Sequence, residues 1–273
     1  MTMMNRRNAG LVLAALAAVA GGVVARAQSG APVAAPITGY LPRGAAPSSV
    51  SLVPPAPTAG SATQARDDAA SKQVLRLMDG PRWALAAQDA NLSFPAAADT
   101  YACALDVKVG PQTTPRLYTL LRRTLMDAGL STYPAKIKYR RARPFMVNGR
   151  PICTPGDANG LRADGSYPSG HAAVGWAWAL ILAEAAPERQ DAVLARGRAY
   201  MRSRMVCNVH WQSDTEAGAT EGSAVVARLH ADPAFRADLD AARGEILAAR
   251  AAGQRPTRDC AAEAAALAAD PGE

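Results

Sequence analysis

The chain has 273 residues, a length that suits one large domain or two small ones and can bury a sizeable core. Its formal net charge is +7, but it has no basic blocks interleaved with aromatic residues, so composition excludes a nucleic-acid-binding surface. Four cysteines without a C-x-x-C pair argue against a structural zinc site.

The N-terminus has the order of a cleaved export signal. Arg6 and Arg7 precede an apolar run over residues 9–25, and an A-x-A sequence ends at Ala27. A permanent membrane anchor is the alternative, but the run is rich in Ala and Gly and shorter than the roughly 20 apolar residues of a spanning helix. We expect cleavage before Gln28 and export by the Sec or the twin-arginine route. The loss of three arginines and no acid lowers the net charge from +7 to +4.

The next segments predict an arm followed by helices. Residues 28–63 are rich in Pro, Ala, Gly and Ser and predict an extended arm that lies over the domain or a partner subunit. Helical patterns follow over residues 67–78, from Pro81 through 87, and from Thr114-Pro115 to a stop at Gly129. No stretch shows a convincing strand alternation, so we predict an all-α fold with one helical domain over 64–250 and a C-terminal tail over 251–273.

Residues 136–144 are strongly basic and end in a proline. On a helix, Lys136, Arg140 and Arg143 share one face, where their like charges repel one another unless an anion lies between them. A solvated basic face is the alternative. Pro144 is expected to end this helix, because the residue before a proline avoids the α region.

A glycine-rich turn over residues 165–171 leads directly into an apolar run over 172–186. The run has no polar face and predicts a buried helix. Ser169, Gly170 and His171 would then lie at the helix N-terminus, where free amides and the helix dipole attract anions. An ordinary capped helix start that contains a histidine is the alternative.

A further helix is expected over residues 189–205, before a segment that contains His210 and Asp214. Four residues apart on a helix, the carboxylate can hydrogen-bond one imidazole nitrogen and leave the other with a lone pair, as in an oriented nucleophile. A surface pair or part of a metal site is the alternative, but the chain has only three histidines. We assign no role to the third, His230.

Together these stretches match three spaced motifs, Lys136-x6-Arg143-Pro144, Pro168-Ser169-Gly170-His171 and Ser203-Arg204-x5-His210-x3-Asp214. This pattern resembles the type 2 phosphatidic acid phosphatase and vanadium haloperoxidase superfamily, and in particular its class A bacterial non-specific acid phosphatases, from about residue 39 to 247. The resemblance implies that His210 attacks phosphorus, Asp214 orients it, and His171 protonates the leaving alcohol. It also implies five groups that bind the phosphoryl oxygens: Lys136, Arg143, Ser169, Gly170 and Arg204.

The resemblance implies a single helical bundle and a periplasmic phosphatase that hydrolyses small phosphate monoesters without a metal or cofactor. Cations and helix-end amides can stabilise a transferring phosphoryl group unaided. The alternatives are a vanadate-dependent haloperoxidase with the same anion site, although such enzymes are generally longer, and a phosphatase that acts mainly as a phosphotransferase. The membrane branch needs several spanning helices, and the sequence predicts none after residue 27. A non-enzymatic helical module would leave the motifs unexplained. The sequence does not determine the oligomeric state and is compatible with a homo-oligomer.

Two positions depart from the family pattern, and the cysteines leave a choice. Ala172 stands where many relatives have a hydroxyl residue, and Arg202 where many have a small or polar one. An even cysteine count in an exported protein predicts two disulfides, with three possible connectivities. From positions along the chain we predict bridges 103–153 and 207–260.

Overall fold

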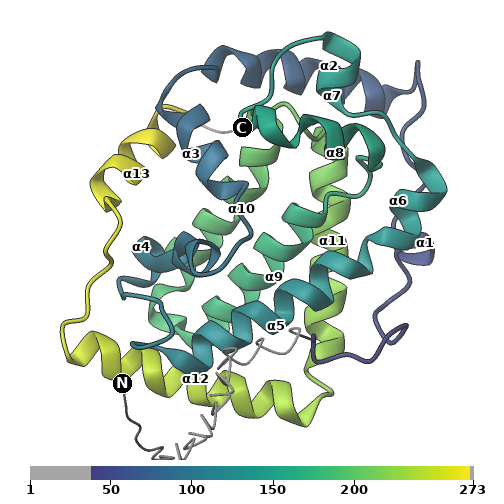
Figure 1. Cartoon of the computed structure of the whole chain (residues 1–273). Coiled ribbons are helices and arrows are strands. Elements are labelled where there is room, and N and C mark those ends of the chain that lie inside the picture. The colour runs from purple at the N-terminus through teal and green to yellow at the C-terminus, as the bar shows by residue number, and fades with distance from the viewer. Residues whose placement is uncertain (1–37, 271–273) are drawn as a thin grey trace, which may run out of the picture. The chain divides into compact units, whose positions relative to one another are not determined.

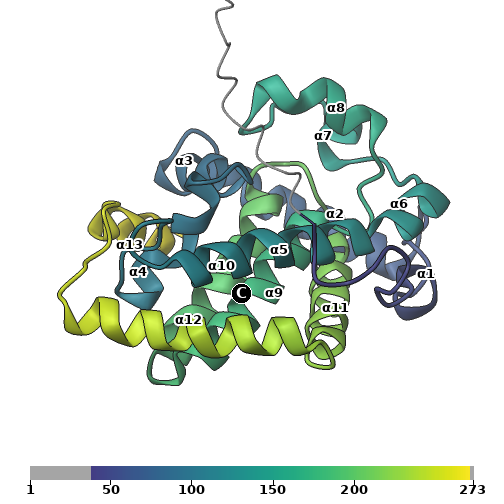
Figure 2. The same cartoon turned by 60° about the horizontal axis from the view of Figure 1, so that its bottom comes forward.

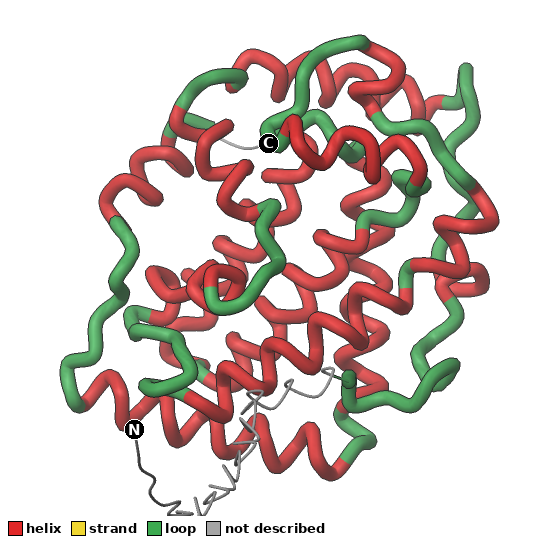
Figure 3. Tube along the Cα trace, in the orientation of Figure 1, coloured by secondary structure: helices red, strands yellow, loops and turns green. Residues whose placement is uncertain are grey.

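The computed structural model describes residues 38–270, so the predicted signal peptide and residues 28–37 of the predicted arm lie outside the described residues. Figure 3 shows helices joined by loops, and no strand occurs in the described chain. The all-α prediction is therefore confirmed. The α-helices are α1 (Ser49–Leu52), α2 (Ala62–Val74), α3 (Pro81–Asp89), α4 (Ala102–Leu105), α5 (Pro115–Ser131), α6 (Tyr133–Tyr139), α7 (Pro144–Asn148), α8 (Ala158–Ala163), α9 (Gly170–Ala185), α10 (Gln190–Val206), α11 (Gln212–Leu229), α12 (Pro233–Ala251) and α13 (Cys260–Ala268). Short 3-10 turns cover Leu75–Leu77, Ala96–Tyr101, Pro155–Asp157 and Pro187–Arg189.

Helix α9 forms the centre of the core, as its lack of a polar face predicted. It packs against α5, α10 and α11, which surround it in Figure 1. Helix α12 packs across α5 and α9 (Figure 2). Trp178 on α9 is buried, and its indole N–H donates to the Leu121 carbonyl of α5 at 3.1 Å. Burying apolar side chains on every side of one helix supplies most of the stability of such a bundle.

Two glycines of α11 allow α11 to approach the start of α9 closely. A Cβ atom added at Gly218 would clash with the Ser169 carbonyl, and one at Gly222 would clash with the Ala173 carbonyl. Only a residue without a side chain fits at these contacts. The N-terminus of α9 is therefore held against α11 by backbone packing.

The N-terminal arm and the C-terminal tail both pack onto the helices where they are described. The arm is irregular except for α1, and the backbone N–H groups of Tyr40 and Leu41 donate to the Asp127 carboxylate of α5 at 2.8 and 3.0 Å. The tail carries α13, a helix that was not predicted from the sequence. The domain boundary at residue 250 stays a prediction.

Several predicted helix ends differ from the observed ones. The helix predicted to begin at residue 67 is α2, which begins five residues earlier, at Ala62. Ser61 caps it there by accepting from the Gln64 amide. The helix that begins at Pro115 continues through Gly129 to Ser131, since a glycine inside a helix costs only about 1 kcal/mol. The helices predicted at Pro81, at 172–186 and at 189–205 are confirmed as α3, α9 and α10.

The basic helix is also shorter than predicted. Helix α6 ends at Tyr139, and Arg140 follows in the left-handed conformation with φ of 44°. Arg143 is extended, with ψ of 156°, and is the N-cap of α7, which begins at Pro144. The predicted helical face of Lys136, Arg140 and Arg143 is therefore wrong, because the chain leaves the α conformation well before the proline.

The predicted disulfide pairing is wrong as well. The bridges join Cys103 to Cys260 and Cys153 to Cys207, with Cα–Cα distances of 5.5 and 4.8 Å. The loop that contains Cys153 folds back onto residues 207–210, where the Asn208 side-chain amide donates to the carbonyls of Arg150 and Pro151 at 3.1 Å. This contact brings Cys153 to Cys207 and leaves Cys103 on α4 beside α13.

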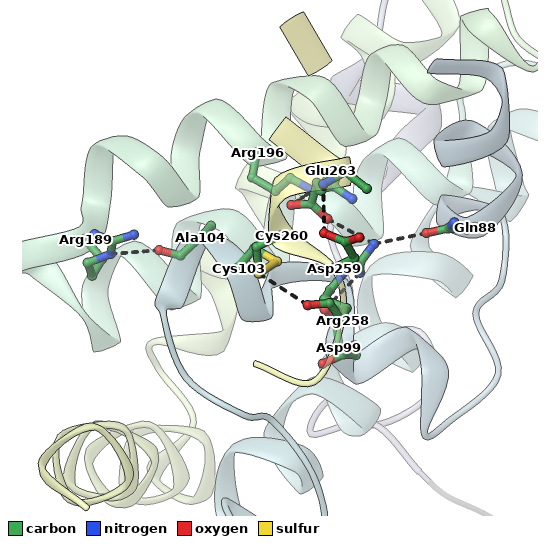
Figure 4. Close-up of a disulfide and its surroundings, with 11 residues drawn as sticks. Gln88, Asp99, Cys103, Ala104, Arg189, Arg196, Arg258, Asp259, Cys260 and Glu263 are labelled. Carbon is green, nitrogen blue, oxygen red and sulfur yellow. Dashed lines mark hydrogen bonds and ion pairs between the residues drawn. A yellow bond between two sulfur atoms is a disulfide. The ribbon is translucent and has the colours of Figure 1, made fainter. Parts of the chain in front are cut away.

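The bridge between Cys103 and Cys260 lies next to a buried ionic cluster that ties α13 to the bundle (Figure 4). Arg196 on α10 donates to Glu263 of α13 at 3.2 Å and to both carboxylate oxygens of Asp89 on α3. Asp89 also accepts from the Ser203 hydroxyl at 2.5 Å. The cluster fixes the end of α3 against α10, one residue before Ala90 and beside Arg204.

Candidate active site

The N-terminus of α9 has the capped geometry that the sequence predicts. Ser169 is buried and is the N-cap, and its hydroxyl oxygen accepts from the Ala172 amide at 3.2 Å. The Ser169 amide donates to the Asp214 carbonyl at 2.9 Å, which joins this turn to α11. The hydroxyl hydrogen of Ser169 and the Gly170 amide at the first helical position are donors suited to an anion.

His210 lies between a carboxylate and a guanidinium. Its Nδ1 is 3.3 Å from the Asp214 Oδ2, and its Nε2 is 3.0 Å from the Arg143 Nη1. Since a guanidinium can only donate, Nε2 is the acceptor and carries the lone pair, and Nδ1–H donates to Asp214. The prediction that both residues lie on one helix is wrong, because α11 begins at Gln212 and His210 precedes it. The pairing of His210 with Asp214 nevertheless forms.

Asp214 is fully buried and is held by a cation that the sequence analysis assigned no role. Arg141 Nη1 donates to Asp214 Oδ1 at 2.6 Å, and Arg141 Nη2 donates to the buried Asp67 of α2 at 2.7 Å. The Trp211 amide donates to the other Asp214 oxygen at 2.9 Å. Burial raises the pKa of Asp214, and Arg141 and the Trp211 amide oppose that rise. In the sequence, only its place in the basic stretch distinguished Arg141.

Three buried cations face the two histidines. Burial lowers the pKa of Lys136 to about 8, helped by Arg143, and burial lowers that of Arg204 to about 10. The Nε and Nη1 groups of Arg204 are buried and have no hydrogen-bond partner within residues 38–270. Burying N–H donors of a cation without acceptors is costly, so this arrangement fits a site that takes an anion.

His171 is close to the same group of charges. Its Nε2 is 3.0 Å from the Ala90 carbonyl, which follows α3, so this nitrogen carries the proton that the carbonyl accepts. Burial and Arg204 lower the pKa of His171 well below its ordinary value, against the Ala90 carbonyl, and His210 and Arg143 lower it further. Burial, followed by Arg143, Lys136 and Arg204, likewise lowers the pKa of His210. The interacting charges show that all three motifs meet at one place.

Three other residues named in the sequence analysis, Arg202, Ala172 and His230, do not belong to this group of charges. The Arg202 guanidinium pairs with the Asp270 carboxylate through two hydrogen bonds of 2.7 and 2.8 Å, so its charge is already neutralised. Ala172 is buried, and its amide donates to the Ser169 hydroxyl that caps α9. His230 is partly exposed, and its Nε2 lies 3.2 Å from the Glu184 carboxylate. Among the described residues no three His, Cys, Asp or Glu side chains are grouped as metal ligands, and no helix there is long and apolar enough to cross a membrane.

Comparison with known proteins gives a consistent result. The PAP2 superfamily model matches residues 117–237. The chain is 42% identical to an acid phosphatase of Zymomonas mobilis over 205 residues, which are 75% of this chain and 77% of that protein. It is 39% identical to a non-specific acid phosphatase of Providencia stuartii, over 76% of this chain and 84% of that protein. For the non-specific acid phosphatase of Salmonella typhimurium the identity is 38%, over 71% and 78%.

Proposed function

The chain belongs to the PAP2 superfamily and is an acid phosphatase, and from this premise we propose that it hydrolyses phosphate monoesters of broad specificity through a phosphohistidine intermediate. The observation that carries the mechanism is the environment of His210. Its Nδ1–H is fixed by Asp214, and the lone pair of Nε2 is directed at the cations. An oriented imidazole beside an anion site is the arrangement that nucleophilic catalysis needs.

In the first step, the phosphoryl oxygens bind to the cations, the Ser169 hydroxyl and the Gly170 amide. The Nε2 lone pair of His210 then forms a bond to phosphorus while the bond from phosphorus to the ester oxygen breaks. His171 gives its proton to that oxygen, so the product leaves as an alcohol. Donors placed around the equatorial oxygens stabilise the charge of the transition state.

In the second step, water attacks the phosphohistidine and His171 takes up a proton from it. The bond between phosphorus and Nε2 breaks, which releases inorganic phosphate and restores neutral His210. Dividing the hydrolysis in this way replaces one difficult displacement by two easier ones. We propose that no metal takes part, because Lys136, Arg143 and Arg204 already supply the positive charge that a metal would bring.

The pKa values support activity on the acid side of neutrality. Burial and the neighbouring cations keep His210 neutral, and therefore nucleophilic, in mildly acidic solution. His171 must be protonated to act as an acid, and a bound phosphate dianion raises its pKa by reversing the local field. We expect a bell-shaped pH profile with its maximum below pH 7.

We further propose that the mature protein begins at Gln28 and acts in the periplasm. The N-terminal sequence pattern and the two disulfides support an oxidising compartment outside the cytoplasm. Fractionation of cells that produce the full chain, with N-terminal sequencing of the product, tests this. A product retained in the cytoplasm with residues 1–27 attached would contradict it.

The mechanism is tested with the purified mature protein on p-nitrophenyl phosphate. His210→Ala should abolish turnover of every substrate, and wild-type enzyme quenched in alkali, where a phosphorus–nitrogen bond survives, should carry a phosphoryl group on His210. His230→Ala is the matched control, because His230 is partly exposed and its contacts with Glu184 and Phe235 lie away from the candidate site, and it should keep full activity. EDTA should leave the rate unchanged. Loss of activity in EDTA that a divalent cation restores would refute metal independence, and an active His210→Ala enzyme would refute the nucleophile.

A further inference from the structure

Asp164 lies between α8 and the turn that leads into α9, and its carboxylate contacts two of the site's cations. Its Oδ2 accepts from Lys136 Nζ at 3.1 Å and from Arg143 Nη2 at 3.1 Å. The side chain of Asp164 is 36% exposed, whereas those of Lys136 and Arg143 are 5% and 1% exposed. The helices on either side of this loop, α8 and α9, carry no other carboxylate that contacts the two cations. Because Asp164 is partly exposed and the two cations are buried, the carboxylate contacts them from the solvent side.

The hydrogen bonds of Arg143 show why this contact matters for binding. Its Nε donates to the backbone carbonyls of Leu161 and Asp164 at 2.8 and 3.2 Å. Its Nη1 donates to the Val209 carbonyl and to His210 at 2.9 and 3.0 Å. Its Nη2 donates to Asp164, with the Gly165 carbonyl at 3.5 Å. A guanidinium has five N–H donors, so each already has an acceptor.

A phosphoryl oxygen can thus bind to Arg143 only by replacing one of these acceptors. Four of them are backbone carbonyls held by helices or loops, and His210 is the proposed nucleophile. The Asp164 carboxylate is the remaining acceptor, and it is both anionic and partly exposed. It offers the cations the same kind of oxygen, at the same hydrogen-bond distance, as a phosphoryl group does.

We propose that Asp164 is a carboxylate that competes with phosphate for Lys136 and Arg143. This inference rests on the proposed function and adds a residue that sets anion affinity. Substrate displaces the carboxylate as it binds, and the carboxylate returns to the cations as inorganic phosphate leaves. Without such a competitor, three buried cations and a helix N-terminus would hold the product tightly and slow its release.

The alternative is that Asp164 only holds the two cations in place, and the two roles predict opposite results. Asp164→Asn keeps the shape and an acceptor oxygen but removes the charge. If the carboxylate competes, this variant should bind inorganic phosphate roughly three- to tenfold more tightly, since two partly exposed ion pairs no longer oppose binding. Its KM should fall in parallel, and its kcat should fall where phosphate release limits turnover. If the carboxylate only positions the cations, phosphate binding should weaken.

The experiment measures the Kd of inorganic phosphate by calorimetry and its inhibition constant, in the wild type and in Asp164→Asn and Asp164→Ala. Asp240→Asn is the matched control, because it removes the same charge from an exposed position of α12. Tighter binding in both Asp164 variants, but not in the control, supports competition. An unchanged or weaker affinity in an active Asp164→Asn enzyme overturns this inference alone. A wild type that neither binds phosphate nor hydrolyses esters overturns this inference and the proposed function together.

Discussion

Glu221 is a fully buried carboxyl group on α11, and it makes the stability of the protein depend on pH. No cationic side chain in the described range 38–270 forms an ion pair with it. Burial raises its pKa to about 7 from an ordinary value of 4.5, and the neighbouring Ser131 hydroxyl only partly opposes the rise. The folded chain thus holds a proton between pH 4.5 and pH 7 that the unfolded chain releases.

The size of the effect follows from the two pKa values. One pKa unit corresponds to about 1.4 kcal/mol, so ionising Glu221 in the folded protein costs about 3 kcal/mol. Because the folded-state pKa is the higher one, the free energy of unfolding falls as the pH rises from 4.5 to 7 and stays low above that range. Below pH 4.5 the group carries no such cost. Glu221 therefore favours stability in the acid range in which we expect the protein to act.

Glu221→Gln removes the titration and keeps the shape of the side chain. The stability of this variant relative to the wild type should be about 3 kcal/mol more favourable at pH 8 than at pH 4.5. For a chain of this length the difference corresponds to roughly 6–12 °C in Tm. Urea unfolding at both pH values measures it. Comparing the two pH values cancels any constant effect of the amide.

Glu216→Gln is the control, because it makes the same change on the same helix at a position with a side chain 48% exposed. An exposed ion pair contributes at most about 1 kcal/mol, so this variant should show little pH dependence. If the stability difference between Glu221→Gln and the wild type is the same at pH 4.5 and pH 8, the assigned pKa of Glu221 is wrong.

Three other perturbations address the site. Arg141→Met leaves Asp214 buried without its cation, so we expect the free energy of unfolding to fall by about 3–5 kcal/mol. The acid limb of the kcat profile should move to higher pH, because the pKa of Asp214 rises. An unshifted limb would contradict the role of Arg141. His171→Ala should slow alkyl phosphates far more than p-nitrophenyl phosphate, whose leaving group needs little protonation, and equal losses at unchanged KM would rule out His171 as the acid. Replacing Cys153 and Cys207 by serine should cost about 4 kcal/mol in chemical unfolding, since the bridge closes a loop with a sequence separation of 54; an unchanged midpoint would contradict this.

The sequence by itself determined the fold class, and it pointed to most of the residues that we propose for the anion site. The run over 172–186 has no polar face, so it could be stable only as a buried helix, and α9 is that helix. Ser169, Gly170 and His171 directly precede the run, so a helix that starts there must present the donor groups of Ser169 and Gly170 at its N-terminus. The four-residue spacing of His210 and Asp214 was sufficient to predict their contact, although the histidine lies just outside α11. These predictions are local, because they depend only on residues a few positions apart along the chain.

Only the tertiary structure decided which distant groups meet. The sequence does not show that Arg141 turns toward Asp214 and Asp67, because the chain leaves the α conformation at Arg140 and the direction of the next residues depends on the helices around them. The partner of Cys103 lies 157 residues away, so its identity depends on where α13 packs. Residues so far apart are brought together by packing and by the long-range balance of buried charges, which no short-range spacing in the sequence encodes.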